Sequence, residues 1–243
     1  IADIQSKFNW PVLVRASAGK NRPERIIEAA TLLKGSWIIG SAIQSSDQEV
    51  LKNIKRSNIS IDAYREFSKF MNSLDKEALT YTEIILALPG DTKEKHFESL
   101  RYGIESQVNR VRMYQAMLLT GTDMASQETR ARYGLLTKFR IIPGGLGAYK
   151  FGEEEIQVAE IEEIIVGSND MPFEDYVSCR IMNLLIETYY NNALCEEIFA
   201  AMRGMERSVF DFLVYLHEHE ELYTPTVKEI LTSFVVATRD DLY

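Results

Sequence analysis

The sequence is poor in the residues that bind metals or form disulfides. It has two cysteines, Cys179 and Cys195, and three histidines in 243 residues. The cysteines are sixteen positions apart, a spacing that forms neither a CxxC metal hook nor a disulfide framework, so we expect two small, buried apolar residues. His217 and His219 are two apart on a predicted helix and point in different directions. We therefore expect no metal site in this chain.

Two further absences limit the class of protein. No apolar run reaches the ~18 residues of a membrane span, and the first residues do not form a signal peptide, so we expect a cytoplasmic protein. The net charge of -9, from 36 acidic and 27 basic residues, argues against nucleic-acid binding. The 46% hydrophobic residues are enough for one large core, or for one core and an appendage.

Short apolar segments alternate with amphipathic segments over the first half of the chain. The expected strands are 11–16, 37–43, 81–88 and 108–118, and the expected helices are 23–34, 47–55, one after Ser60 with apolar positions between 61 and 71, and 93–106. Regular alternation of strand and helix predicts an α/β fold with a parallel sheet and right-handed crossovers.

Polar side chains at the helix starts suggest caps. Ser46-Asp47-Gln48-Glu49 has the pattern of a capping box in which Ser46 caps the helix and Glu49 reaches back. Asp91 is the expected cap of the helix at 93–106. Ser60 is expected to cap the helix that follows it.

Four polar turns, at 15–20, 44–47, 88–92 and 119–123, fall at the carboxyl ends of the expected strands. Sites of parallel α/β proteins lie at this edge, so the turns predict a shared site for a small polar ligand. The simpler alternative is that strand-to-helix turns are polar in any protein. In the last strand Arg110, Arg112 and Tyr114 share one face, which fits either a polar cavity or an exposed edge strand.

The pattern changes after Gly121. We expect a short helix at 126–133, an irregular glycine-rich segment at 142–147 that lacks the Gly-Lys-Ser/Thr of a P-loop, and a mostly helical chain from about Glu153. The expected helices there are 172–190, capped by Ser168 or Asp170, then 192–202, 206–219 and 224–236. This divides the chain into residues 1–148 and a helical extension, 149–243.

Three sequence runs, in this order, resemble the radical S-adenosylmethionine (SAM) superfamily, and most of all its branch with an N-terminal cobalamin-binding domain. The runs are Ile43-Gln44-Ser45 with Val50-Leu51-Lys52-Asn53-Ile54-Lys55-Arg56, then Thr82-Glu83-Ile84-Ile85-Leu86-Ala87-Leu88-Pro89-Gly90-Asp91-Thr92, then Tyr114-Gln115-Ala116-Met117-Leu118-Leu119-Thr120-Gly121-Thr122. The resemblance covers about residues 1–140. It implies a partial (β/α) barrel with about four of its six strands present, followed by a C-terminal α-helical region.

The resemblance also implies roles for single residues. Gln44, with Ser45 beside it, and Glu83 match positions that hold the ribose hydroxyls of SAM, because amide and carboxylate oxygens bind a diol well. Arg56 matches the arginine that binds the methionine carboxylate of SAM. The adenine is expected between the Gly90 turn and a pair of residues after the last strand, Met117 and Leu118. The strand pattern, rather than the resemblance, makes Arg112 and Tyr114 candidates to contact an anionic or phenolic substrate, although they could instead neutralise Glu83.

Some positions leave alternatives open. Relatives place a carboxylate where this chain has Arg15-Ala16-Ser17, so an amine contact is in doubt. Arg56 could be a solvated helix-end cation, and Glu83 could pair across strands with Arg112 instead of binding a ligand.

The CxxxCxxC motif of the family, which holds a [4Fe-4S] cluster, is missing from the sequence. With the abrupt start at Ile1, this suggests a C-terminal fragment of a radical SAM enzyme, inactive alone, with the cluster and any cobalamin domain in a missing N-terminal half. The whole enzyme is expected to cleave SAM to a 5'-deoxyadenosyl radical and to methylate or cyclise a small-molecule substrate. The alternatives are a cluster-free binding or scaffold module and an unrelated α/β-barrel enzyme. An open sheet edge near Pro11 is expected to favour dimers.

Overall fold

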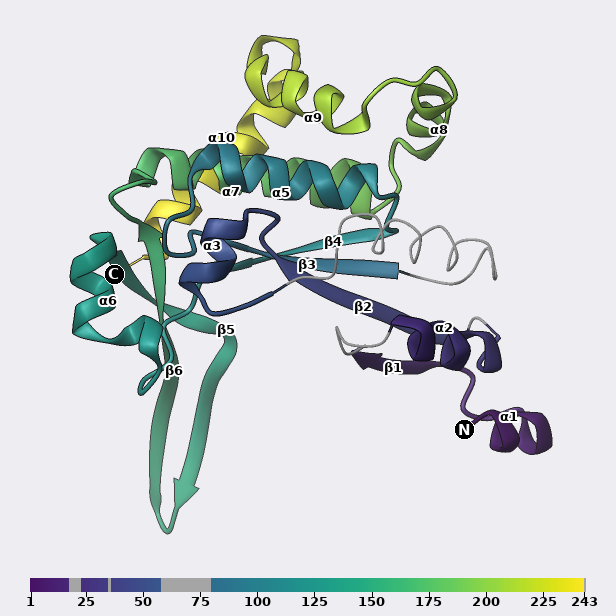
Figure 1. Cartoon of the computed structure of the whole chain (residues 1–243). Helices are drawn as coiled ribbons and strands as arrows, with labels where there is room; N and C mark the ends of the chain where they lie inside the picture. The colour runs from purple at the N-terminus through teal and green to yellow at the C-terminus, as the bar shows by residue number, and fades with distance from the viewer. Residues whose placement is uncertain (18–22, 35, 58–79, 243) are drawn as a thin grey trace.

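The computed structural model describes residues 1–17, 23–34, 36–57 and 80–242. Its α/β part has a twisted parallel sheet with long helices packed on one face (Figure 1). The strands are β1 Val14–Ser17, β2 Trp37–Gln44, β3 Thr80–Leu86 and β4 Arg110–Gln115, in the order β1-β2-β3-β4. All three pairings are parallel, which confirms the predicted α/β class and strand direction.

Short helices lie between the strands. They are α2 Pro23–Leu32, α3 Gln48–Asn53 and α5 Lys93–Glu105, and an additional helix, α1 Ala2–Phe8, opens the chain. The predicted helix after Ser60 lies outside the described residues.

Two of the predicted caps are wrong by one residue. The cap of α3 is Asp47, whose Oδ1 accepts a hydrogen bond from the amide of Val50 at 2.9 Å. Ser46 instead contacts the hydroxyl of Ser99 at 3.1 Å. The cap of α5 is Thr92 rather than Asp91. In both turns two neighbouring residues can accept from the first helical amides, and the backbone geometry selects the second.

The main core lies between the sheet and the helices. Every second residue of β3 is buried, namely Thr80, Thr82, Ile84 and Leu86. Gly103 allows α5 to approach the sheet closely, because an added Cβ would lie 3.2 Å from the side chains of both Thr82 and Val111. The other face of β3 is only partly buried and stays open for a site.

A long antiparallel hairpin follows β4 and the short elements after it. Its strands are β5 Leu136–Phe151 and β6 Glu154–Gly167. The predictions of an irregular segment at 142–147 and of helix from about Glu153 are wrong here. A register shift between Ile141 and Leu146 accommodates the glycines within β5, and residues 154–166 pair along its length.

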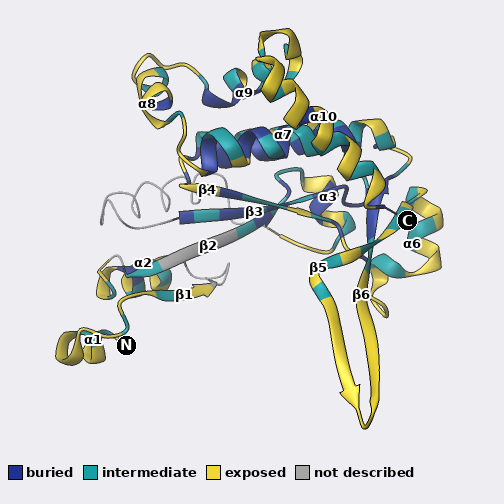
Figure 2. Ribbon diagram, turned by 180° about the vertical axis from the view of Figure 1, so that it is seen from behind, coloured by how far each residue is buried: buried dark blue, intermediate teal, exposed yellow. Residues whose placement is uncertain are grey.

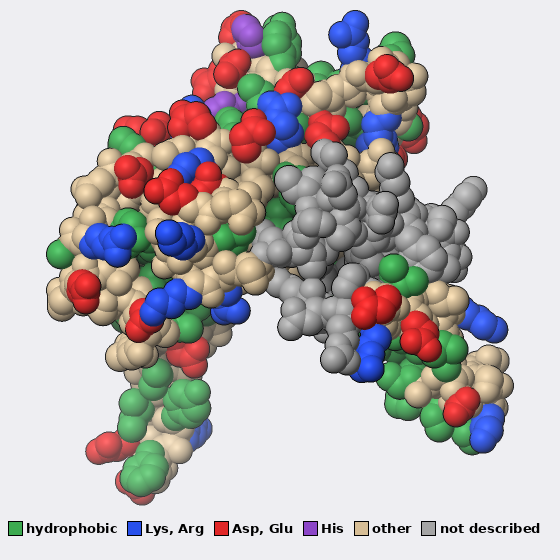
Figure 3. Space-filling view, in the orientation of Figure 1, with side chains coloured by type: hydrophobic (Ala, Val, Ile, Leu, Met, Phe, Trp, Pro, Cys, Tyr) green, Lys and Arg blue, Asp and Glu red, His purple; other side chains and the backbone are tan. Residues whose placement is uncertain are grey.

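The hairpin is joined to the sheet at its base and exposed beyond it. Leu118 donates to the carbonyl of Glu163 at 2.8 Å, and Ile165 donates to the carbonyl of Ala116 at 2.8 Å. Figure 2 shows the distal arm exposed, and Figure 3 shows hydrophobic side chains gathered on it. Tyr149 and Phe151 there are 62% and 79% exposed.

Helices form the rest of the chain. They are α7 Phe173–Leu185 with a π-helical continuation at Ile186–Asn191, α8 Glu196–Gly204, α9 Val209–Glu218, a short turn at Glu220–Leu222, and α10 Pro225–Asp240. Neither Ser168 nor Asp170 caps α7: its N-cap is Pro172, and the Ser168 hydroxyl accepts from the amides of Asp170 and Met171. The predicted boundary at 148/149 falls inside β5, and the division into two domains stays a prediction.

The remaining observations concern the burial of the two cysteines and the length and composition of the helices. Cys179 is buried, as expected, whereas Cys195 is only partly buried. In the described ranges no helix combines the length and the apolar composition needed to span a membrane.

Leu100 tests the packing of α5 on the sheet. Its side chain is fully buried, so Leu100→Ala is expected to lower the free energy of unfolding by about 2–5 kcal/mol. Leu194→Ala is the matched control, because Leu194 is 63% exposed and its loss is expected to change stability by less than about 0.5 kcal/mol. Urea denaturation of the three proteins measures both values, and equal losses would contradict this packing.

Candidate functional site

A cavity of about 560 Å³ opens at the carboxyl ends of β2 and β3. Its walls come from the end of α3, the β3–α5 turn, the segment after β4, and the elements that follow it, a 3₁₀ turn at Asp123–Ala125 and α6 Gln127–Tyr133. Part of the predicted site is therefore assembled at the edge that the sequence pattern indicated.

Gln44 lies at the last position of β2, where the pairing with β3 is irregular. Ala42 pairs with Glu83, but Gln44 pairs with Ile84, so one residue of β2 is extra. Gln44 has a φ of 62°, in the left-handed region that non-glycine residues seldom adopt. Its side chain lines the cavity, and its buried Oε1 accepts no hydrogen bond from any described residue.

An unpaired buried acceptor destabilises a folded protein by about 1–3 kcal/mol. Together with the irregular backbone at Gln44, the unpaired oxygen indicates that this side chain has a role other than packing in the core. A ligand hydroxyl or amine that entered the cavity could donate to this oxygen.

Arg56 follows α3 and also lines the cavity. Its amide donates to the carbonyl of Leu51 at 2.8 Å, which closes the helix and fixes where the side chain begins. The side chain is exposed, and it has no ion pair with the part of the chain that the structure describes. Beside it, Lys55 forms an ion pair with Asp123 from the opposite wall. This pair lowers the pKa of Asp123, mainly through the hydrogen bond from Lys55.

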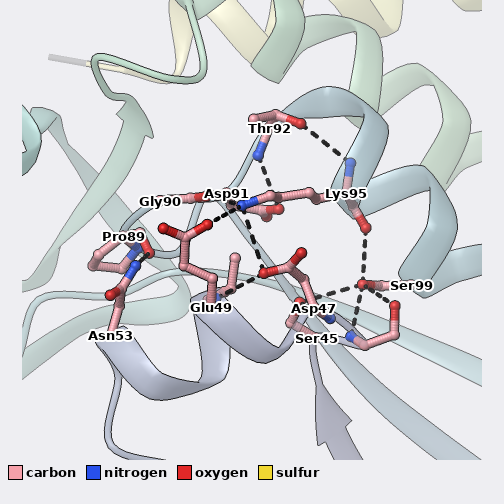
Figure 4. A network of polar contacts seen from close by, with 12 residues as sticks. Ser45, Asp47, Glu49, Asn53, Pro89, Gly90, Asp91, Thr92, Lys95 and Ser99 are labelled. Carbon is pink, nitrogen blue, oxygen red and sulfur yellow. Dashed lines mark hydrogen bonds and ion pairs between the residues drawn. The ribbon is translucent and has the colours of Figure 1, made fainter.

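The β3–α5 turn forms a rigid wall of the cavity (Figure 4). The amide of Asn53 donates to the carbonyl of Pro89 at 3.0 Å, which ties α3 to the turn. Lys95 donates to the carbonyl of Gly90 at 3.1 Å and to Glu49 at 3.1 Å. Gly90 has a φ of 81°, and a Cβ there would lie 2.5 Å from the Asn53 nitrogen. Gly90 thus shapes the wall without lining the cavity itself.

The segment after β4 contributes apolar groups. Met117 and Leu119 line the cavity, while Leu118 between them is only 6% exposed and packs in the core. Ser45 is likewise buried away from the cavity, where its hydroxyl accepts from the amide of Asp47 at 3.1 Å. Of the predicted SAM contacts, the structure therefore brings Gln44, Arg56 and Met117 into one cavity, but not Ser45 or Leu118.

Glu83 lies on the open face of the sheet, outside the cavity lining. It is paired in register with Arg112 on β4, and the Nη1 to Oε1 distance is 3.9 Å. The Arg112 guanidinium also stacks 4.0 Å from the centre of the Tyr81 ring. The cross-strand pairing considered as an alternative for Glu83 is present. Tyr114, in register with the cavity residue Ile85, is 47% exposed on the same face.

A buried acid–base pair lies directly behind the Gly90 turn. Burial raises the pKa of Asp91 to about 8, against the hydrogen bonds from Thr92 and Ala87. Burial lowers the pKa of His96 to about 4, opposed by a contact with Asn183 at 3.5 Å. The two side chains approach to 3.8 Å, which is too far for a hydrogen bond. Both groups are therefore neutral near pH 6.

Several cavity residues were not foreseen as site residues. They are Asn53, Arg132 and Tyr133, whereas Asp123, which also lines the cavity, ends the predicted polar turn at 119–123. Asn53 lies inside a run that supports the resemblance, but α6 was predicted only as a helix. No periodicity indicated that α6 would lie against the ends of the strands.

The residues present fit SAM but not the metal cofactors of the family. The cavity combines an unpaired acceptor at Gln44, a cation at Arg56 and apolar walls, which suit a ribose, an amino-acid carboxylate and an adenine. For a [4Fe-4S] cluster the sequence lacks the CxxxCxxC ligands. Within the described residues, no three His, Cys, Asp or Glu side chains are grouped as a metal would need.

Comparison with known proteins found similarity to curated methyltransferases. No family model matches the chain. A 2-(S-pantetheinyl)-carbapenam-3-carboxylate methyltransferase from Streptantibioticus cattleyicolor is 25% identical over 98% of this chain and 34% of its own length. The cobalamin-dependent radical SAM methyltransferase TokK from Streptomyces tokunonensis is 29% identical over 73% of this chain and 26% of its own length.

The chain is therefore similar to a cobalamin-dependent radical SAM methyltransferase and to a carbapenam methyltransferase. It resembles a C-terminal portion of a radical SAM protein, and it spans about a third and about a quarter of the length of these two curated relatives.

Gly90 tests the wall that the β3–α5 turn forms. Gly90→Ala is expected to lower stability by about 1–3 kcal/mol, because the φ of 81° is strained for alanine and Asn53 must release Pro89. Gly204→Ala is the control, since Gly204 ends α8 with no atom within 4 Å of an added Cβ. It is expected to be neutral or slightly stabilising. Thermal unfolding that ranks the two variants the other way would contradict the assigned turn.

Asp91 gives a pH test of the same region. Between the unfolded pKa of about 4 and the folded pKa of about 8, the folded protein keeps a proton that the unfolded chain releases, so raising the pH destabilises the fold. Asp91→Asn removes this penalty. His96 is present in both proteins, so its titration contributes equally to each and cancels from their difference. From pH 6.5 to 8, the stability of the variant relative to wild type is expected to rise by on the order of 1 kcal/mol per pH unit. Denaturation across this range should show the rise and a plateau above pH 8; a flat difference would contradict the buried neutral acid.

Proposed function

We propose that this chain is the SAM-binding part of a cobalamin-dependent radical SAM methyltransferase. The observation that supports this most directly is the buried, unpaired Gln44 Oε1 in a cavity that also contains Arg56. In the whole protein, a [4Fe-4S] cluster would supply the one electron that cleaves SAM to methionine and a 5'-deoxyadenosyl radical, and cobalamin would carry a methyl group taken from a second SAM molecule. The sequence lacks the CxxxCxxC ligands of such a cluster, so we assign them to another part of the whole protein. The chain alone is expected to bind SAM without reacting it.

The adenosyl group occupies the apolar part of the cavity. Leu88 and Pro89 form one wall and Met117 the other, so the flat adenine lies between a rigid turn and a flexible thioether side chain. A ribose hydroxyl donates to Gln44 Oε1 and satisfies it. Because this hydrogen bond satisfies an acceptor that is unpaired in the empty cavity, it contributes binding free energy that an acceptor already paired within the protein would not contribute.

The methionine part of SAM extends toward the mouth of the cavity. Its carboxylate binds Arg56 through the two-pronged geometry that guanidinium groups favour. Lys55 neutralises Asp123 nearby, so Asp123 does not compete for Arg56. The Lys55–Asp123 pair joins the two walls of the mouth and restricts the path of the ligand.

The sheet corresponds to the last four strands of a partial barrel, and residues 149–243 to an extension of it. Within the described residues β1 has a partner strand on one side only. We assign the free side to the strands that hold the cluster in the whole protein, rather than to a second copy of the chain. The small-molecule substrate then lies on the open face of the sheet, near Arg112 and Tyr114.

The alternative function, a cluster-free binding or scaffold module, has one observation in its favour. The lining residues of the cavity include neither cysteine nor histidine, the side chains that hold iron–sulfur clusters. An iron–sulfur absorption band and 5'-deoxyadenosine release by the intact protein would exclude this alternative. Both functions require the cavity to bind an adenosyl ligand.

Binding of S-adenosylhomocysteine and 5'-methylthioadenosine tests the assignment of Gln44 and Arg56. The second ligand has the adenosyl group without the carboxylate. Gln44→Ala is expected to weaken both ligands about tenfold, the effect of one lost hydrogen bond. Arg56→Ala is expected to weaken S-adenosylhomocysteine about tenfold and to leave 5'-methylthioadenosine unchanged. Isothermal titration calorimetry of wild type and of both variants measures the affinity of each protein for each ligand.

Arg207→Ala is the matched control. Arg207 is exposed and follows α8 as Arg56 follows α3, and its amide donates to the carbonyl of Met202 at 2.9 Å. Its replacement is expected to change neither affinity. Equal loss of both ligands in Arg56→Ala, or unchanged binding in Gln44→Ala, would overturn the assignment.

A further inference from the structure

A second cavity, of about 340 Å³, lies between α7, α10 and the base of the hairpin. It shares no lining residue with the cavity at Gln44. Its polar lining residues are Gln115, Arg140, Tyr176, Arg180, Thr238 and Asp241. The proposed SAM site does not account for this group of side chains.

Arg180, on α7, is the unusual member of the group. Its Nε is buried and has no hydrogen-bond partner among the described residues. Its guanidinium carbon lies 5.4 Å from the centre of the Phe234 ring, an arrangement that holds the side chain in the cavity. Burial lowers the pKa of Arg180, the Tyr176 hydroxyl raises it, and the charge of Arg140 lowers it.

The other charged groups of the cavity do not neutralise Arg180. Arg140 is itself paired with Glu162 and donates to Gln115. Asp241 lines the cavity from the α10 side, but the described residues include no carboxylate within 4 Å of the Arg180 nitrogens. A largely buried cation without a counter-charge is costly to a fold, and truncating such a group is often neutral or stabilising.

We propose that this second cavity binds a small oxyanion, the carboxylate or phosphate group of a small molecule, on the guanidinium of Arg180. Arg140 lies on the hairpin side of the cavity, where its ion pair with Glu162 holds it in place. Tyr176 lines the same cavity, and a tyrosine hydroxyl can donate a hydrogen bond to an anion. Phe234 provides an apolar surface for the rest of the molecule. The volume lies at the lower end of the range for small-ligand sites.

Thermal unfolding of the purified chain with added anions tests this site. Inorganic phosphate and acetate are titrated separately at constant ionic strength, so that the two chemical sources are distinguished. At ten times the dissociation constant, the better anion is expected to raise the midpoint of wild type by roughly 3–6 °C. Arg180→Met is expected to lose this shift, while its own midpoint without anion equals or exceeds that of wild type.

Two further variants complete the design. Arg207→Met, at an exposed position, is expected to keep the full shift. Arg180→Lys retains the charge without the fork of donors and is expected to give a smaller shift, and it replaces Arg180→Met if that variant does not fold. S-adenosylhomocysteine binding is measured on Arg180→Met and is expected to stay unchanged, so that failure here is separate from failure of the proposed function. No shift in wild type with either anion, or an equal shift in wild type and Arg180→Met, would overturn the proposal.

Discussion

The parallel pairing of β2 with β3 is the constraint on which the candidate site depends. It places the end of β2 beside the Pro89–Gly90 turn, although more than forty residues separate them in the chain. The extra residue in β2 then turns Gln44 into the cavity instead of continuing the ladder. The Asn53 hydrogen bond to Pro89 fixes α3, and with it Arg56, relative to the same turn. A few backbone contacts thus assemble a ligand-sized space before any ligand is bound.

Two of the five buried side-chain atoms that lack a hydrogen-bond partner in the described chain belong to residues that line a cavity. Gln44 lines one cavity and Arg180 the other, and each has a buried polar atom without a partner. Protein interiors pair nearly all such atoms, because each unpaired one destabilises the fold. The packing of the core offsets this destabilisation, because α5 and α7 bury the opposite face of the sheet. In the same region burial keeps Asp91 and His96 neutral. A ligand that formed a hydrogen bond with Gln44 or Arg180 would therefore recover free energy that the empty cavity lacks.

Much of the α/β part was predictable, because β-branched strands and amphipathic helices have clear periodicity. Caps were not, since Ser46 and Asp47 compete for the same amides and only the backbone decides between them. The hairpin was missed because glycines at 144 and 145 suggested a loop, whereas a local register shift accommodates them within the strand. At the site, resemblance identified Gln44, Arg56 and Met117, but neighbouring residues alternate direction, which removes Leu118 from the lining. Tyr133 could not be foreseen, because it depends on how α6 folds back.

The central claim is that Gln44 completes its hydrogen bonding with an adenosyl ligand. The most direct measurement is a crystal structure of this chain with S-adenosylhomocysteine. The account predicts adenine between Pro89 and Met117, with a ribose hydroxyl within about 3 Å of Gln44 Oε1 and the carboxylate on Arg56. A ligand bound elsewhere, or bound in the cavity with Gln44 Oε1 still unpaired, would contradict it.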